Sequence, residues 1–222
     1  MRLRALLKTE WRLMYRDLSD ALMPFLFLTL ALMLCVFGIG GSKQELMRVA
    51  PNMLWVIILL TNLITIPHIF REDARVGMLE VYQMSLGCPM TLIVGKFCIH
   101  FLSVNLPLLL FSYPLFHLLQ GDTAIWGNLL TTLLLGTPIL SCYVVFAATL
   151  TLGSAHRMAL GMIITLPLLT PLMMLATSLI SAARLGMETT PYILFLSAYG
   201  LLSILIALWG GIWALKASPV NT

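Results

Sequence analysis

The sequence predicts an all-α integral membrane protein with six transmembrane helices, preceded by an amphipathic helix that lies on the membrane surface. Three observations predict this class. Of the 222 residues, 60% are hydrophobic and only 10% are charged. The hydrophobic residues gather in six long runs, and lysine and arginine favour alternate connections between these runs. Because an ordinary soluble domain is about 25% charged, the solvent for most of this chain must be lipid.

The N-terminal segment, residues 1–20, is predicted to form the surface helix. Arg4, Lys8, Arg12 and Arg16 repeat every four residues and form one basic ridge. Such a helix should lie flat on an anionic cytoplasmic leaflet. Two acidic residues break the pattern by pointing into its apolar side, Glu10 and Asp17. They either reach water or pair with a nearby arginine, or, together with Arg12, they face a protein partner at the membrane surface.

Six apolar runs follow, and each is long enough to cross a hydrocarbon core of about 30 Å, which requires about 20 helical residues. Helices are the expected spans because lipid cannot satisfy irregular backbone. We treat residues 1–222 as a single transmembrane domain built from these runs, which are Ala21–Gly40, Ala50–Ile69, Thr91–Leu119, Ala124–Leu152, Met158–Ser181 and Pro191–Leu215.

The distribution of lysine and arginine predicts the orientation. With the N-terminus in the cytoplasm, ten of the thirteen cationic residues fall on the inner side, and only Lys43, Arg48 and Arg184 fall outside. Acidic residues divide six to three, so the net charge is +4 inside (ten minus six) and zero outside (three minus three). The positive-inside rule therefore places both termini in the cytoplasm, and the basic balance needs no nucleic-acid partner to explain it.

The polar stretch Phe70–Leu86 is the densest charge cluster between two spans, and the cytoplasmic segment 71–90 contains most of it. From Met78 a helix would place apolar side chains on one side, opposite Glu80. We interpret the segment as a coupling helix that docks in a groove of a separate ATP-hydrolysing protein. The alternative is a solvated loop whose charges only fix the topology. The candidate coupling residues are Arg71, Asp73, Gly77, Met78, Leu79, Glu80 and Tyr82.

Prolines inside the spans mark candidate moving parts. Pro167 and Pro171 lie four residues apart in the fifth span, and each removes a backbone hydrogen bond. They produce either a static kink or a hinge, or a break before a short outer helix within residues 177–187. Pro138, which follows Gly136 and Thr137, predicts a second break in the fourth span.

The chain shows no motif for catalysis or for a resident cofactor. It contains no G-x-x-x-x-G-K-[ST] segment, so ATP must bind to another chain. The four cysteines are scattered and predict no disulfide, zinc site or covalent haem site. We expect no metal site and no ionisable residue at mid-membrane, where a secondary transporter would carry one.

Histidines are the candidate haem ligands, because imidazole binds haem iron well. His68 and His100 are expected near the inner ends of the second and third spans, and His117 near the outer end of the third. A histidine in such a position commonly just reaches interfacial water, which is the alternative interpretation for all three.

The combination of three motifs resembles a known family. They are Phe70–Glu80 (FREDARVGMLE), Leu133–Leu140 (LLLGTPIL) and Leu166–Leu172 (LPLLTPL). With a surface helix, two spans, this loop and four further spans, the whole chain resembles ABC-2-type transporter permeases. Among these it is most similar to the haem exporter protein B family, the membrane subunit of the cytochrome c maturation ABC transporter.

This resemblance implies a non-catalytic permease subunit in a bacterial inner membrane, or in the mitochondrial inner membrane if the protein is organellar. It also implies a homodimer served by a separate ATP-binding subunit, beside haem-handling membrane proteins and a periplasmic haem chaperone. Haem would be cargo rather than a resident cofactor. The subunit would either carry haem across the membrane or couple ATP hydrolysis to release of the loaded chaperone. An ABC-2 permease for another cargo, and a membrane scaffold or transporter working without an ATPase, are the remaining alternatives.

Overall fold

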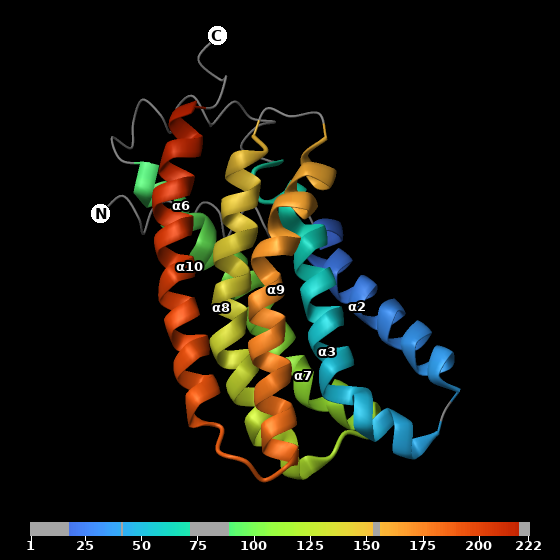
Figure 1. The fold of residues 1–222 in the computed structure, drawn as a ribbon. Coiled ribbons are helices and arrows are strands. Elements are labelled where there is room, and N and C mark those ends of the chain that lie inside the picture. The colour runs from blue at the N-terminus through green and yellow to red at the C-terminus, as the bar shows by residue number, and fades with distance from the viewer. Residues whose placement is uncertain (1–17, 41, 72–88, 153–155, 218–222) are drawn as a thin grey trace.

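The computed structural model describes residues 18–40, 42–71, 89–152 and 156–217, and all regular structure in these ranges is helical (Figure 1). The elements in chain order are α2 (Leu18–Ile39), α3 (Lys43–Thr65), η1 (Ile66–His68), α6 (Pro89–His100), η2 (Phe101–Asn105), α7 (Leu106–Leu118), η3 (Thr123–Ile125), α8 (Trp126–Leu150), α9 (Arg157–Arg184) and α10 (Thr190–Ala217). The predicted surface helix, apart from residues 18–20, lies outside the described residues.

Five helical segments are long and apolar enough to cross a membrane. They are Lys43–His68, Met90–Leu118, Thr123–Leu150, Ala159–Arg184 and Thr190–Leu215. The apolar part of α2, Met23–Ile39, is shorter. The prediction of an all-helical, multi-pass membrane protein is therefore confirmed, with five candidate spans and one shorter apolar helix, while the count of six spans stays a prediction.

The connections alternate between the two ends of the bundle, as a multi-pass chain requires. The turns between α2 and α3, between α7 and η3, and between α9 and α10 gather at one end, and the C-terminal ends of η1 and α8 lie at the other (Figure 1). A guanidinium nitrogen of Arg184 donates to the backbone oxygen of Met47 at 3.2 Å, which ties the end of α9 to the start of α3. This contact puts two of the three cations predicted to lie outside, Arg184 and Arg48, at the same end of the bundle.

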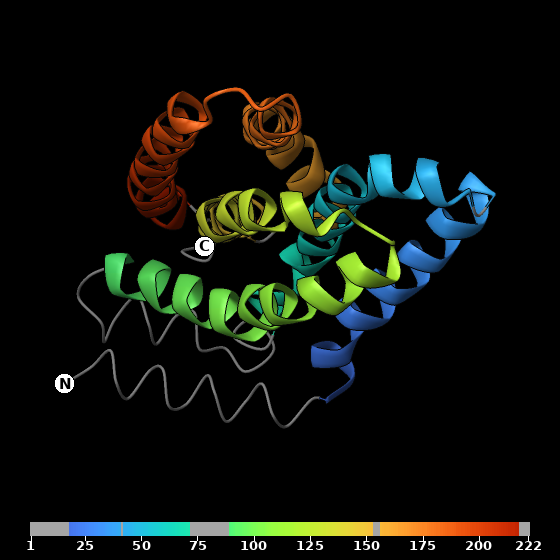
Figure 2. The same ribbon diagram turned by 90° about the horizontal axis from the view of Figure 1, so that it is seen from below.

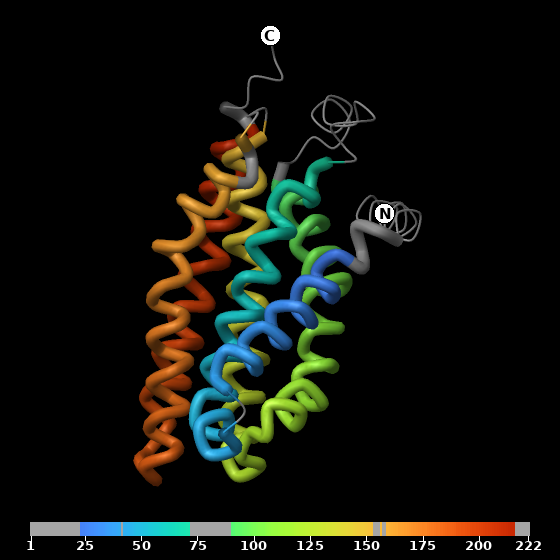
Figure 3. The backbone as a smooth tube through the Cα atoms, turned by 90° about the vertical axis from the view of Figure 1, so that its right-hand side faces the viewer, coloured from blue at the N-terminus to red at the C-terminus, as the bar shows by residue number. Residues whose placement is uncertain are grey.

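Helix α8 occupies the centre of the bundle, with α9 and α10 on one side and α3 and the α6–α7 segment on the other (Figure 2). Along most of its length it presents buried residues in every direction. Helix α2 packs mainly on α3 and crosses it obliquely at the edge of the bundle (Figure 3). A helix that is apolar all round is typical of the interior of a membrane bundle, so the fourth span forms the core against which the other helices pack.

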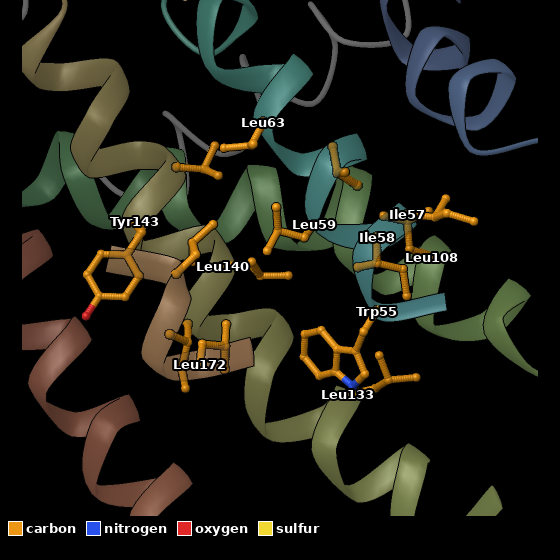
Figure 4. Close-up of a cluster of buried hydrophobic side chains, with 14 of the residues drawn as sticks. Trp55, Ile57, Ile58, Leu59, Leu63, Leu108, Leu133, Leu140, Tyr143 and Leu172 are labelled. Atoms are coloured by element: carbon orange, nitrogen blue, oxygen red, sulfur yellow. The ribbon is translucent and has the colours of Figure 1, made fainter. Parts of the chain in front are cut away.

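Small residues in the fourth and sixth spans allow this close packing. The fully buried indole of Trp55 lies against α8 (Figure 4), where a Cβ at Gly136 would overlap the ring. The indole nitrogen donates to Thr132 Oγ1 at 2.9 Å, one turn earlier on α8. Gly210 and Gly211 similarly bring α10 against Phe146 of α8 and Ile93 of α6. Gly136 is thus a packing residue rather than the start of a helix break.

The predicted break in the fourth span and the predicted short outer helix are both wrong. Helix α8 continues through Pro138 to Leu150, and α9 continues through Pro167 and Pro171 to Arg184. Figure 1 shows that α9 changes direction along its length without being interrupted. It ends where Gly186 adopts a positive φ of 65°, with Met187 donating to Ala182 O and Gly186 to Ala183 O. This is a Schellman motif, so glycine at 186 ends the helix.

The third span is divided, although its sequence predicts one continuous helix. Between α6 and α7, residues Phe101–Asn105 form a π-helical turn, in which the backbone N–H of Leu106 donates to Phe101 O, five residues earlier. Pro107 supplies a physical reason. It has no N–H for the Ser103 carbonyl, and its ring crowds the preceding turn, so the regular i to i−4 ladder cannot pass through this point.

Candidate functional site

The described residues include only the two ends of the predicted coupling segment, Arg71 at its start and Pro89 and Met90 at its end. Arg71 is the one coupling candidate among them, and it is exposed. The other coupling candidates lie outside the described residues (Asp73, Gly77, Met78, Leu79, Glu80 and Tyr82), as do the surface-helix candidates Glu10, Arg12 and Asp17. These assignments stay predictions. The site is therefore built from η1 and α6, which lead into and out of the segment.

The entrance is held against the bundle by an aromatic anchor. Phe70 is buried, and the Nζ atom of Lys96 on α6 lies 5.4 Å from the centre of its ring. An ammonium group at this distance is attracted to the negative face of the ring. Next to this anchor, an Arg71 guanidinium nitrogen lies 3.5 Å from Nδ1 of His68. The residue just before the coupling segment thus rests on α6, the helix to which the segment returns.

A connected set of polar side chains lies between α3, the third span and α8, and we call it the buried polar network. His100 Nε2 lies 2.9 Å from Thr65 Oγ1, and His100 Nδ1 lies 3.2 Å from Ser141 Oγ. An amide N–H of Asn105 donates to Ser141 Oγ at 2.7 Å. Asn105 and Asn62 also exchange two amide hydrogen bonds of 3.0 Å. All members of the network are buried: Asn62, Thr65, His100, Asn105 and Ser141.

The hydrogen bonds of the network define its proton positions. Thr65 has one hydroxyl hydrogen, which it donates to Asn62 O at 2.6 Å, so its oxygen must accept from Nε2–H of His100. Ser141 Oγ accepts from Asn105, which leaves its own hydrogen for Nδ1. The arrangement thus fits an uncharged imidazole with its proton on Nε2. The remaining amide hydrogen of Asn62 goes to Ile58 O at 2.9 Å, so every side-chain donor hydrogen in the network has an acceptor.

The π-helical turn makes this network possible. In an α-helix, residues five apart are rotated by about 140° from one another, which would turn Asn105 away from His100. A π-helical turn pairs residues i and i+5 and therefore brings the two side chains to the same face. Both then reach Ser141 on α8. π-Bulges of this kind occur frequently at functional sites.

The three candidate haem ligands occupy different environments. His68 is half-buried beside Arg71, and His117 is exposed, with its ring 4.5 Å from that of Tyr113 in an edge-on contact. His100 has both ring nitrogens engaged in the buried polar network, so binding iron would first require one of these bonds to break. The structure does not bring the three histidines together. Among the described residues, no group of three or more His, Cys, Asp or Glu side chains could hold a metal ion.

Two ionisable residues are buried within the third candidate span, Met90–Leu118. Lys96 lies six residues from its first residue, and His100 lies ten residues from it. His100 bonds Thr65, three residues before the end of the second candidate span, so its place near the cytoplasmic end of the bundle agrees with the expectation from the sequence. The expectation of no ionisable residue at mid-membrane stays a prediction. Hydropathy averages hide single polar residues, whereas the pairing of Asn62 with Asn105 depends on a turn that no 3.6-residue pattern predicts.

The candidate hinge residues lie on two neighbouring helices. Pro167 and Pro171 are on the exposed side of α9, and Pro138 is half-buried in α8. A proline lacks the N–H that would bond to the carbonyl four residues earlier. Near this weakened part of α9, the hydroxyl of Tyr199 on α10 donates to the backbone oxygen of Leu168. This bond ties α9 to α10 one residue after Pro167.

Comparison with known proteins decides the family. The family model described as CcmB protein matches residues 1–218. This chain belongs to the CcmB family. Proteins of the family named "Heme exporter protein B" include one from Haemophilus influenzae, 35% identical over 82% of each chain. One from Pseudomonas aeruginosa is 32% identical over 90% of this chain and 89% of its own. One from Paracoccus denitrificans is 31% identical over 97% of this chain and 99% of its own. The match to the CcmB family therefore covers the whole bundle and is not confined to a single motif.

Proposed function

We propose that this chain is the membrane subunit of an ABC transporter that exports haem or releases a haem-loaded chaperone during maturation of c-type cytochromes. The observation that carries this proposal is the match of the CcmB family model to residues 1–218. Relatives named for haem export share 31–35% identity with most of the chain. The apolar helices of the structure support a role inside the membrane.

In this proposal the chain has no catalytic site, and a separate ATP-binding subunit supplies the energy. That subunit docks on the coupling segment 71–90, which emerges from a bundle of six spans with ABC-2 architecture, α2 being the first. Two copies of the chain assemble, with both termini on the cytoplasmic side of a bacterial inner membrane. Haem-handling membrane proteins and a periplasmic haem chaperone are the other partners. The basic N-terminal segment and the cations near the coupling segment support this orientation.

The environment of His100 bears on the mechanism. A transporter that carries ions or protons needs an ionisable group able to exchange its partner. The protein itself satisfies both ring nitrogens of His100, which favours a structural role for this buried histidine. A buried histidine with a structural role gives no support to a secondary transporter that works without an ATPase.

The experiment that tests the proposal measures ATPase binding. Leu79→Asp and Glu80→Lys should leave the chain in the membrane but release the ATPase subunit, because an apolar anchor of a small interface contributes about 1–4 kcal/mol, or roughly five- to several-hundred-fold in affinity. The measurement is a pull-down of the ATPase with each variant, together with a haem stain of periplasmic c-type cytochromes.

Gln44→Lys provides the matched control, since Gln44 is exposed at the opposite end of α3. It should change neither measurement, because surface substitutions usually act within about 0.5 kcal/mol. Full retention of the ATPase by both loop variants would contradict the coupling assignment.

A further inference from the structure

The buried polar network lies where it can transmit a force from the coupling segment. We infer that Asn62, Thr65, His100, Asn105 and Ser141 join α3, the third span and α8 into one body that moves as a unit when the ATPase acts on the coupling segment. His100 is the central positioning residue of the buried polar network. The inference rests on the proposed function and extends it from the docking surface to the interior of the bundle.

The first step of the argument is the position of the network. Thr65 ends α3 six residues before Arg71, and His100 ends α6 on the other side of the coupling segment. The hydrogen bond between these two side chains therefore closes the polypeptide loop on its membrane side. Any displacement of the segment must move both flanking helices at this bond or break it.

The second step is a continuous path from the segment to the network. Phe70 contacts Lys96 at the entrance, and Lys96 lies one helical turn before His100 on α6. Residues four apart share a helix face, so the aromatic anchor and His100 follow each other along one side of α6. His100 then continues the path through Ser141 to α8, the central helix of the bundle.

The third step is the completeness of the hydrogen bonding. Each side-chain donor hydrogen of the network has an acceptor, and two of the bonds are reciprocal between Asn62 and Asn105. Sliding one helix past another would leave a buried donor or acceptor unpaired, which is costly where water cannot replace the partner. The three elements are therefore held in one register, and a push on one of them displaces the others.

The test uses the tagged full-length chain, expressed with its partner subunits in membranes. His100→Leu and Asn105→Leu each remove the hydrogen bonds of one member of the buried polar network. Ser141→Ala removes the hydroxyl that both of these residues contact, with little change in side-chain volume. His100→Gln is the conservative variant, because its amide offers an NH₂ donor in place of Nε2–H and an acceptor oxygen in place of Nδ1. Trp55→Phe is the matched control. It deletes another buried hydrogen bond between α3 and α8 that does not involve the third span.

Three quantities are measured per amount of chain: co-purified ATPase, ATP hydrolysis, and haem-stained c-type cytochromes. The leucine variants should retain the ATPase and its hydrolysis, yet lower maturation per assembled complex by roughly two- to thirtyfold, the range for residues that carry coupling between sites. His100→Gln should recover most of this loss, and Trp55→Phe should match the unaltered chain. A purely structural role would instead lower all three quantities together through a smaller amount of complex.

Normal maturation per assembled complex in both leucine variants would overturn the inference, as would a loss in His100→Gln equal to that in His100→Leu. If the leucine variants do not reach the membrane, Ser141→Ala provides the test. Normal maturation in this variant would then overturn the inference. An unaltered chain that retains no ATPase would overturn the proposed function and the inference with it. Retention of the ATPase with normal maturation in every variant would overturn the inference alone.

Discussion

The hydroxyl of Tyr199 on α10 donates to the backbone oxygen of Leu168 on α9, three residues before Pro171. This contact is a side-chain hydrogen bond between two helices that pack together. It falls on the part of α9 where two prolines have removed backbone donors. The bond thus ties α10 to the backbone of α9 near the two carbonyls that the prolines leave without an intrahelical donor, those of Ile163 and Pro167.

Removing this donor should loosen the contact between α9 and α10. Tyr199→Phe is expected to lower the stability of the protein in detergent by about 0.5–1.5 kcal/mol, the usual net contribution of one hydrogen bond. The measurement is thermal unfolding of the purified protein. Tyr192→Phe makes the same chemical change near the start of α10 and serves as the control. Equal stability of the Tyr199 variant and the unaltered protein would mean that the bond contributes nothing.

The prolines of α9 should matter for function more than for folding. Replacing Pro167 and Pro171 by alanine restores two backbone donors and should straighten the helix. If the pair forms a working hinge, the double variant will reach the membrane in normal amounts but support less maturation of c-type cytochromes. The chain level is measured by immunoblot and maturation by haem stain. Normal maturation would identify a static kink.

Packing between α3 and α8 provides a sharp test of the structure itself. Gly136→Ala places a methyl group against the buried indole of Trp55 and should lower stability by about 1–3 kcal/mol, as overpacking does. Gly127→Ala on the same helix is the control, because the space beside Gly127 is open. This variant should be neutral or slightly stabilising, since alanine favours a helix over glycine by about 1 kcal/mol. Equal effects at the two positions would contradict the packing of Trp55 on α8.

The topology can be checked with single cysteines in a chain whose native cysteines are replaced. Thr123→Cys and Glu188→Cys lie at exposed positions in connections at one end of the bundle, and His156→Cys lies at an exposed position at the other. An impermeant thiol reagent added from outside should label the first two and not the third, because ten of thirteen cationic residues are predicted to be cytoplasmic. The reverse pattern would invert the orientation.

The sequence was most informative about features that depend on composition alone. The boundaries of the fifth and sixth helices follow the apolar runs to within three residues, because a long apolar run in lipid has no regular alternative to a helix. The surroundings of the prolines were predicted less well. Helix α9 continues through both prolines, where local sequence alone suggested a break, and Tyr199 of α10 bonds its backbone at Leu168.

The buried polar network illustrates what a helical pattern cannot predict. Asn62 and Asn105 are 43 residues apart and pair only because α3 and the third span pack side by side. His100 and Asn105 share a face only through the π-helical turn. A reader of the sequence sees isolated polar residues in apolar runs, and each of them has several possible partners. The three-dimensional packing selects one partner for each.

The π-helical turn also lets the third span hold one residue more than a regular helix with the same orientation of α7 would hold. If Phe101–Asn105 kept all five residues in an ordinary α-helix, α7 would turn by about 100° relative to α6. The buried residues Leu108, Ser112 and Phe116 would then exchange places with exposed ones such as Leu110 and Phe111. A homologous chain that is one residue shorter within this stretch could keep the orientation of α7 with an ordinary α-helix, so single-residue alignment gaps in the third span should fall here.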